Sequence, residues 1–313
     1  MTPQQKAWWL FGGIAVLLAV ASIISKILSA RAATDSSRAV IGNLNARVNA
    51  WWVMVAILAV AFTLGKTATL VLFGLASFFA LREFITLTPT RPSDYRPLLL
   101  SFYILVPAQY VLIGYDQYGI FAIFIPVYAF LILPAVATFA ADTTDFLERT
   151  AKIQWGVMIT VYCISYAPAL LMLDIAGYEG SSGLLLFYLL LIAQLSDVSQ
   201  YVFGKLFGKT KLAPHVSPSK TVEGLLGGGL STTAIGGAMW WITPFTWRQS
   251  ALMSFVIVVM GVLGGLTLSA VKRSLGAKDW GVMIEGHGGM LDRLDSVSFA
   301  APIFFHLTRY FLT

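Results

Sequence analysis

Long apolar runs recur along almost the whole chain, and they limit its fold more than any other feature of the sequence. A helix needs about 20 mainly apolar residues to cross the hydrocarbon core of a bilayer, and the chain has many runs of this kind. Hydrophobic residues make up 58% of the 313 residues and charged residues only 12%, whereas soluble domains carry about 25% charged residues. The sequence therefore predicts an all-α, polytopic integral membrane protein.

About ten runs are candidate transmembrane helices. The second and third are short, and the turn at residues 64–67 makes them a tight hairpin, so either they tilt little or the pair does not fully cross. We expect N-terminal transmembrane helices in residues 1–150, and catalytic transmembrane helices with cytoplasmic loops in residues 151–313. The ten runs lie near residues 7–27, 50–64, 67–81, 97–114, 119–139, 153–173, 183–204, 225–243, 249–270 and 296–312.

The first run resembles a secretory signal peptide in one respect, because a stretch of small residues, 28–33, follows it. Two features argue against that interpretation. The run is longer than the 7–15 residues typical of a signal peptide's apolar core, and only Lys6 precedes it. We therefore predict that residues 7–27 form a retained helix.

The positive charges predict the topology. Of the 21 Lys and Arg residues, 17 lie in the odd-numbered loops between the runs. Lys and Arg concentrate in cytoplasmic loops of membrane proteins, so the odd loops are expected to face the cytoplasm and both termini the outside. The net charge of +6 is thus a topological signal. It favours contact with anionic membrane lipids and gives no indication of nucleic acid binding.

Three features that resemble chemical sites have simpler explanations. The single cysteine, Cys163, excludes an intrachain disulfide and a cysteine metal cluster. His215 is expected to be a solvated loop residue, and His306 a hydrogen-bonded residue of the last run. The Gly-Lys-Thr at residues 208–210 is not a phosphate-binding P-loop, because Phe203 stands where that motif needs glycine.

The segment 269–295 is far more charged than the rest of the chain. Asp292 and Asp295 share one helix face because they are three residues apart, and an apolar run follows them directly. Acids beside the membrane interior are costly and usually functional. A divalent cation such as Mg²⁺ would relieve their repulsion, and Asp279 is a third candidate ligand. The alternative is that Asp292 forms a structural salt bridge with Arg273 or Arg293.

Glycines surround the one histidine of this segment. Gly286, Gly288 and Gly289 flank His287, and glycine lets the backbone approach a ligand closely. Backbone N–H groups in such turns bind phosphates. Alone this pattern is weak, because a single histidine is more often a hydrogen-bonded structural residue.

The segment 217–224 reads as the start of a helix that can bind an anion. Ser219 or Thr221 can cap the helix, and Glu223 lies in its first turn, where acids are favoured. Lys220 then stands at a helix N-terminus, which attracts anions. The alternative is an ordinary capped helix with a solvated lysine.

Asp197 interrupts the seventh run within a polar patch at residues 194–200. Polar residues inside a transmembrane helix normally face a cavity or the interior of the bundle. Asp197 is therefore a fourth candidate ligand.

Together these segments resemble the CDP-diacylglycerol synthase (phosphatidate cytidylyltransferase) family. Residues 196–224 match its Asp at the end of a span, then G-K-x-x-G-K, L-A-P and S-P-x-K-T-x-E-G. The match covers about residues 190–300, and the N-terminal half shares only hydropathy. In residues 269–295 the signature residues are Ser269, Lys272, Arg273, Lys278, Asp279, His287, Gly288, Gly289, Asp292, Arg293 and Asp295.

Three residues depart from the family pattern. Glu285 stands where the family usually has a small residue or Pro. Val198 and Gln200 stand where a small residue and Ala are common. These departures bear on the substrate range and leave the candidate ligands unchanged.

The resemblance implies that CTP and phosphatidate react to give CDP-diacylglycerol and pyrophosphate. It implies Mg²⁺ on Asp279 and Asp292, with Asp295 or Asp197 as further ligands, and a second cation such as K⁺, of which the sequence gives no sign. We expect the inner (cytoplasmic) membrane of a bacterium, with the active site facing the cytoplasm; a homodimer stays open. The catalytic candidates are Lys272, Arg273, Lys278, His287 and Arg293, and the substrate-binding candidates are Ser217, Ser219, Lys220, Thr221, Gly288 and Gly289.

Two other functions stay open. A CTP-dependent lipid kinase of the dolichol or phytol type would form no CDP-lipid. A transporter of an anionic substrate would show internal symmetry between two halves, whereas the polar residues here cluster in the C-terminal third only.

Overall fold

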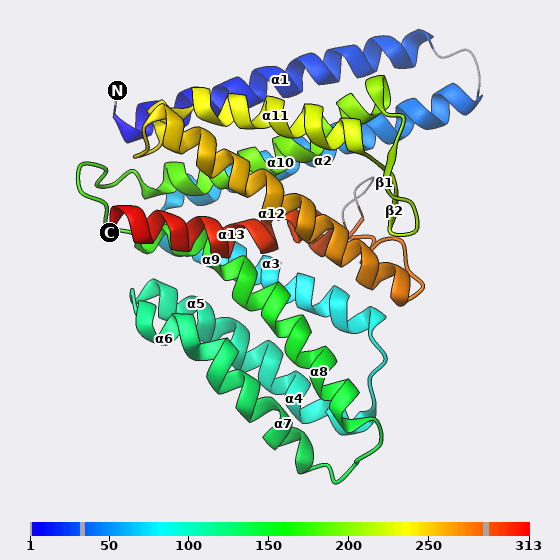
Figure 1. Ribbon diagram of the computed structural model, residues 1–313, viewed down its shortest axis with the longest axis vertical. Helices are drawn as coiled ribbons and strands as arrows, with labels where there is room; N and C mark the ends of the chain where they lie inside the picture. Colours follow the sequence, from blue (N-terminus) through cyan, green and yellow to red (C-terminus); the bar gives the residue numbers. More distant parts are fainter. Residues whose placement is uncertain (1, 32–34, 284–287) are drawn as a thin grey trace.

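The computed structural model is a bundle of long helices (Figure 1) and describes residues 2–31, 35–283 and 288–313. The predicted all-α fold is confirmed, because the described residues contain only one pair of short strands. The N-terminal half comprises α1 (Pro3–Arg31), α2 (Asp35–Leu64), α3 (Lys66–Leu87), η1 (Pro92–Asp94), α4 (Tyr95–Leu100), η2 (Ser101–Leu105), α5 (Val106–Gly114), α6 (Tyr118–Ile123), η3 (Phe124–Ala129) and α7 (Phe130–Thr138). The remainder comprises α8 (Phe146–Val157), η4 (Met158–Cys163), α9 (Ile164–Ala169), η5 (Leu170–Met172), α10 (Ser182–Phe207), β1 (Lys211–Ala213), β2 (Ser217–Thr221), α11 (Val222–Ala238), η6 (Trp240–Ile242), α12 (Trp247–Ser274) and α13 (Met290–Leu312).

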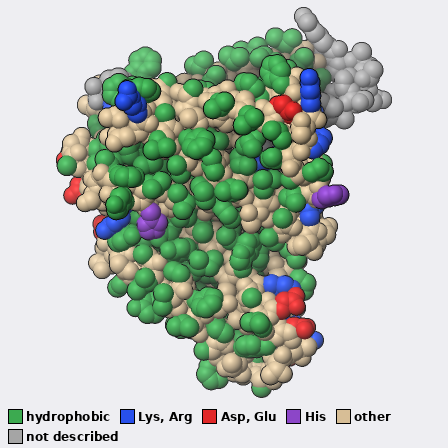
Figure 2. Space-filling model, in the orientation of Figure 1, with side chains coloured by type: hydrophobic (Ala, Val, Ile, Leu, Met, Phe, Trp, Pro, Cys, Tyr) green, Lys and Arg blue, Asp and Glu red, His purple; other side chains and the backbone are tan. Residues whose placement is uncertain are grey.

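Eight helical stretches of the described chain are long and apolar enough to cross a membrane. The runs expected near 225–243 and 296–312 also form helices, α11 and α13, but these are not among the eight. Helix α11 has only 17 residues, and α13 carries charged residues in its first two turns. Hydrophobic side chains cover most of the face shown in Figure 2, as contact with lipid tails requires.

The expectation of a short second and third helix is wrong. The candidate spans here are Asn45–Leu64, with 20 residues, and Lys66–Leu87, with 22 residues, so each can cross a bilayer. Gly65 makes the turn between them with a φ of +92°, a conformation that favours glycine. The third helix continues past residue 81 to Leu87, and in this added stretch the polar side chain of Glu83 is buried and hydrogen-bonded.

The loops gather at the two ends of the bundle as the charge pattern predicts. Figure 1 shows both termini at one end, here called the terminal end, and the β1–β2 hairpin at the other, the hairpin end. At the terminal end, Lys66 pairs with Asp116 across two even-numbered loops, with 2.6 Å between nitrogen and oxygen. Arg149 pairs with Asp94 and with Asp142. These two pairs join the loop after the third run to the loop after the fifth, which are both odd-numbered. The division at residue 150 stays a prediction; that residue lies within α8.

Thiol labelling checks which end faces the cytoplasm. In a Cys163→Ala background, a cysteine at Ser217 is expected to react only with reagent on the inside, because the hairpin end carries the basic loops. A cysteine at Glu179, in the terminal-end segment 178–182, is expected to react only from outside. The impermeant reagent is applied to intact and to opened vesicles, and the reverse pattern would refute the topology.

Glycines let the last four long helices pack with their backbones close together. A Cβ added at Gly224 of α11 would lie 2.7 Å from the carbonyl oxygen of Gln200 on α10. One added at Gly264 of α12 would lie 2.5 Å from the carbonyl oxygen of Asp295 on α13. Small residues at helix contacts are typical of membrane proteins. This packing brings polar residues of α10 and α13 toward the same region.

The hairpin that leads into α11 is held by Glu223. Its carboxylate accepts hydrogen bonds from the backbone N–H groups of Lys209 (3.0 Å) and Thr210 (3.1 Å). Backbone hydrogen bonds from Lys209, from Glu223 itself and from Thr210, in this order, lower the pKa of Glu223 to about 2, so the carboxylate stays charged at any physiological pH. Thr221, the last residue of β2, caps α11 by accepting from the N–H of Gly224 at 3.1 Å, which decides between the two predicted caps.

Candidate active site

A buried ion pair connects α12 to the first turn of α13. The Nζ atom of Lys272 lies 2.5 Å from Oδ1 of Asp292, and the two side chains are only 10% and 6% exposed. The second oxygen, Oδ2, accepts hydrogen bonds from the backbone N–H groups of Trp280 (2.8 Å) and Gly289 (2.9 Å). Asp292 therefore ties Trp280 to Gly289. The described residues of this segment, 280–283 and 288–289, are here called the glycine loop.

Asp292 forms a salt bridge, as the alternative interpretation predicted, but its partner is Lys272 rather than Arg273 or Arg293. Oδ2 already accepts two hydrogen bonds, whereas Oδ1 accepts one and keeps a lone pair for another contact. Ligation of a cation by Asp292 stays a prediction. The pair is also close to Asp295, with which Lys272 interacts electrostatically.

A second polar cluster lies next to this pair and joins the two charged segments. Ser296 Oγ donates to Asp197 Oδ2 at 2.9 Å, and its backbone N–H donates to Asp295 Oδ1 at 2.7 Å. A Cβ added at Gly265 would lie 3.2 Å from Lys220 Nζ and 3.8 Å from Asp295 Oδ2. Side chains from α10, β2 and α13 thus converge beside α12, as the two sequence motifs predicted.

The carboxylates of this second cluster suit a divalent cation. Asp197 and Asp295 approach each other through Ser296, and carboxylate oxygens are the protein ligands that Mg²⁺ prefers, completed by water and substrate phosphates. Within the described residues, no group of three or more His, Cys, Asp or Glu side chains is placed to hold a metal ion. The residues therefore fit a site with two protein carboxylates, and the metal itself stays a prediction.

Gly288 separates two of the candidate ligands. Its φ is +82°, and an added Cβ would lie 2.7 Å from Asp292 Oδ2 and 3.5 Å from Asp279 Cβ. A side chain at this position would be both strained and crowded. The missing side chain at Gly288 therefore leaves room for the exposed Asp279 on one side and the buried Asp292 on the other.

The remaining predicted site residues are distributed around these two clusters. Arg273, Lys278 and Ser219 are exposed, and Ser217 is half-buried. The backbone carbonyl oxygen of Arg293 accepts a hydrogen bond from Gln194 Nε2 at 3.2 Å. Its buried Nε has no hydrogen-bond partner among the described residues. Three sequence predictions, on Glu285, Gly286 and His287, fall outside the residues that the structure describes.

Sequence reasoning missed Glu83 of α3. This side chain is 8% exposed, and its oxygens accept hydrogen bonds from the N–H groups of Met290 (2.8 Å) and Leu291 (2.9 Å) at the start of α13. An acid this close to an apolar run is a signal in its own right. The predicted end of the third run at residue 81 places Glu83 in a loop, whereas it lies within α3 (Lys66–Leu87).

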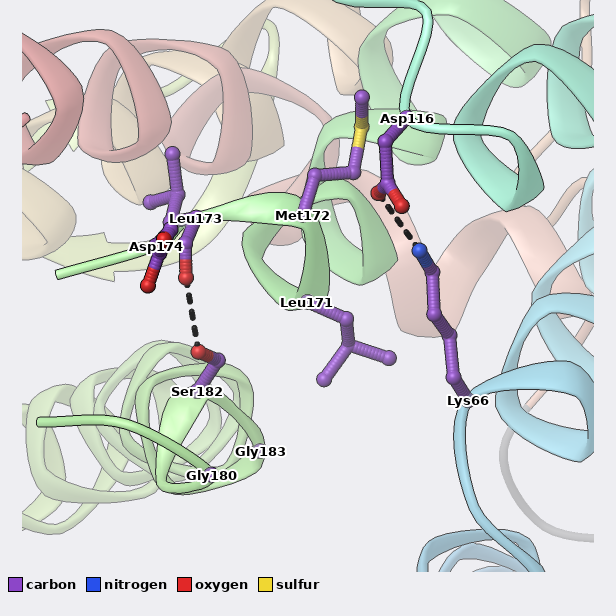
Figure 3. Close-up of a pocket in the computed structure, with 9 residues that line it drawn as sticks. All are labelled: Lys66, Asp116, Leu171, Met172, Leu173, Asp174, Gly180, Ser182 and Gly183. Atoms are coloured by element: carbon purple, nitrogen blue, oxygen red, sulfur yellow. Dashed lines mark hydrogen bonds and ion pairs between the residues drawn. The ribbon is translucent and has the colours of Figure 1, made fainter.

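A separate pocket of about 370 Å³ lies at the terminal end (Figure 3). The ion pair of Lys66 and Asp116 forms part of its wall, and Ser182 Oγ donates to the carbonyl oxygen of Leu173 at 3.0 Å. None of its residues belongs to the candidate site. The lining residues are Lys66, Asp116, Leu171, Met172, Leu173, Asp174, Gly180, Ser182 and Gly183.

The model of the cytidylyltransferase family matches residues 45–311, which include every candidate site residue. The chain belongs to the cytidylyltransferase family. The match extends far beyond residues 190–300, so the N-terminal half shares more with the family than hydropathy. This cytidylyltransferase is accordingly a nucleotidyltransferase, and its apolar helices make it an integral membrane protein.

Several proteins are similar to this cytidylyltransferase. One from Escherichia coli (strain K12), named "Uncharacterized protein YnbB", is 37% identical over 297 residues, which is 94% of this chain and 95% of that protein. The phosphatidate cytidylyltransferase of Bacillus subtilis (strain 168) is 32% identical over 216 residues, 68% of this chain and 77% of that protein. That of Staphylococcus aureus (strain COL) is 41% identical over 118 residues, 37% of this chain and 45% of that protein.

Proposed function

We propose that this cytidylyltransferase is a phosphatidate cytidylyltransferase, which converts CTP and phosphatidate into CDP-diacylglycerol and pyrophosphate in phospholipid biosynthesis. The observation that carries the proposal is the meeting of Asp197, Lys220 and Asp295 next to the Lys272–Asp292 pair. Such a group of opposite charges suits a polyphosphate with a divalent cation. The names of the Bacillus and Staphylococcus relatives support this choice of lipid and nucleotide.

In the proposed reaction an oxygen of the lipid phosphate attacks the α-phosphorus of CTP. The bond from that phosphorus to the oxygen bridging to the β-phosphate breaks, and pyrophosphate leaves. A phosphate monoester is largely dianionic at pH 7, because its second pKa is about 6. The site therefore needs no strong general base. It must align the two phosphates and neutralise their charge.

The roles of the residues follow from their places. Asp197 and Asp295 would hold Mg²⁺, with Asp279 and Asp292 as the further candidate ligands, and the cation would neutralise charge on the phosphates and orient them when bound. Lys220, at the base of the hairpin, would contact a phosphate of CTP. The exposed Arg273 and Lys278 would balance the triphosphate and the leaving pyrophosphate. A role for K⁺ and assembly as a homodimer stay predictions.

The orientation belongs to the same proposal. The site lies at the hairpin end, where the basic loops gather, so we place that end at the cytoplasmic face of a bacterial inner membrane. CTP is a cytoplasmic nucleotide, and phosphatidate would reach the site from the bilayer. The labelling experiment on Ser217 and Glu179 tests this orientation independently of the reaction.

Product analysis tests the proposed reaction. Protein purified in detergent, given Mg²⁺, CTP and phosphatidate, is expected to form CDP-diacylglycerol and pyrophosphate in equal amounts, and EDTA should abolish both products. A CTP-dependent lipid kinase would release CDP and phosphorylate a lipid alcohol, without a CDP-lipid. Formation of neither product, from a protein that is folded and binds Mg²⁺ and CTP, would reject the proposal.

A further inference from the structure

The carboxylate of Glu83 reaches the glycine loop from a distant part of the chain. It lies on α3, and its two oxygens accept hydrogen bonds from the N–H groups of Met290 and Leu291. These N–H groups belong to the first turn of α13, where no backbone acceptor within the helix is within reach. A negative charge there also interacts favourably with the helix dipole. Glu83 thus caps the helix that carries Asp292 and Asp295.

Burial of this charge needs compensation. A carboxylate taken out of water is costly unless it is paired or fully hydrogen-bonded. Among the described residues, Glu83 makes no ion pair with a Lys, Arg or His side chain, so its compensation comes from the N–H groups of α13. Water or a neutral capping side chain could also accept hydrogen bonds from these two N–H groups, so capping alone does not require a buried carboxylate. Its position against the glycine loop suggests a more specific role.

Both ends of the glycine loop lie directly against Glu83. A Cβ added at Gly281 would lie 2.8 Å from Glu83 Oε1, and one added at Gly289 would collide with Oε2. The neighbouring Phe84 packs its ring against Trp280, with 5.4 Å between the ring centroids. Trp280 is 2% exposed, so this contact is part of the core.

Two carboxylates therefore clamp one loop from opposite helices. Asp292 accepts hydrogen bonds from the N–H groups of residues 280 and 289, and Glu83 fills the space next to residues 281 and 289. Gly288, next to residue 289, lies beside both Asp279 and Asp292. Movement of the Glu83 side of the clamp would displace Asp292 together with the loop.

We propose that Glu83, supported by Phe84, is a positioning residue that holds the glycine loop and the first turn of α13 in the arrangement needed for nucleotidyl transfer. The catalytic part of this inference rests on the proposed function, whereas the clamp itself does not. Glu83 acts through Asp292 and the loop, without contact to the reacting phosphates. Misplacement of reacting groups by about 1 Å can cost about 100-fold in rate.

Hydrogen exchange tests the clamp without any assay of activity. In Glu83→Ala, amide exchange in peptides covering residues 280–291 is expected to rise at least about tenfold, while peptides of α10 and α12 keep their protection. Glu83→Asp should give an intermediate rise, because it keeps the charge on a shorter side chain. The matched control is Glu148→Gln, which changes a 64% exposed carboxylate and should leave exchange in the loop unchanged.

Kinetics test the positioning role. Glu83→Ala and Glu83→Gln are expected to lower kcat by about 10- to 100-fold with KM for phosphatidate unchanged, and Glu83→Asp should recover part of kcat. Gln is expected to rescue poorly, since its amide would turn an N–H donor toward an N–H of α13. A purely structural role predicts that melting temperature and the amount of active enzyme fall while kcat per active site stays normal.

Two results would overturn the inference. Unchanged exchange of residues 280–291 in a folded Glu83→Ala protein would remove the clamp. Increased exchange with normal kcat per active site would reduce Glu83 to a structural cap. If wild-type protein forms no CDP-diacylglycerol, the proposed function fails, and the exchange data still decide whether Glu83 holds the loop. If Glu83→Ala does not fold, Glu83→Asp and Glu83→Gln give the same comparison.

Discussion

Asp292→Asn is expected to lower the rate of CDP-diacylglycerol formation at least about 100-fold, on the scale of losing a strong electrostatic contact. The same change should lower stability, because the buried Lys272 would lose the carboxylate oxygen that lies 2.5 Å from its Nζ atom. Breaking a buried ion pair by removing one partner costs about 3–5 kcal/mol. Initial rates at saturating Mg²⁺ and thermal melting in detergent measure the two effects separately.

A double variant separates structure from catalysis. Lys272→Met combined with Asp292→Asn removes both charges of the pair. No buried ammonium group is then left without its partner, and much of the stability should return. If Asp292 or Lys272 acts on the phosphates, the rate stays low in the double variant. If the pair is structural only, the rate recovers together with the melting temperature. Near-normal activity of Asp292→Asn alone would assign the residue to the fold.

Lys220→Ala is expected to lower kcat/KM for CTP by about 100-fold, on the same electrostatic scale. The Lys220 side chain is half-buried next to Asp295 rather than solvated, which favours contact with a bound phosphate. Lys220→Arg should fall between wild type and Ala, because arginine keeps the charge but has a different shape. The measurement is steady-state kinetics with CTP varied at saturating phosphatidate.

Lys211→Ala is the matched control for this series. Lys211 lies in the same hairpin and pairs in register with Thr221, but its side chain is exposed. An exposed lysine contributes little energy, so this variant should match wild type. Equal kcat/KM for wild type, Lys220→Arg and Lys220→Ala would show that Lys220 does not contact CTP, and the site would then depend on residues 269–295.

The sequence predicted which segments meet, because that depends on local chemistry. The polar patch around Asp197, the capped helix after Lys220 and the acids at 292 and 295 each mark one side of the membrane and one face of a helix. Loops on the same side can meet, and here they do. Thr221 was one of two predicted caps, and the choice needed the β1–β2 hairpin, which the pattern of residues 211–221 did not indicate.

The partners inside the site could not be predicted from these patterns. Whether Asp292 pairs with Lys272, Arg273 or Arg293 depends on how α12 and α13 are rotated where they pack at Gly264. Spacing along one segment does not fix that rotation. Glu83 was missed for a related reason, since its contact joins residues 207 positions apart and no local signal points from one to the other.

That long separation has a consequence for synthesis of the protein. A ribosome adds about 5–20 residues per second, so the N–H groups of α13 emerge about 10–40 s after the Glu83 carboxylate that they will bind. During this interval α3 is already made while its buried charge still lacks these donors, and water or another part of the chain must solvate it. The site can close only as one of the last events of insertion, so a ribosome stalled before residue 290 would carry a long chain without nucleotidyl transfer activity.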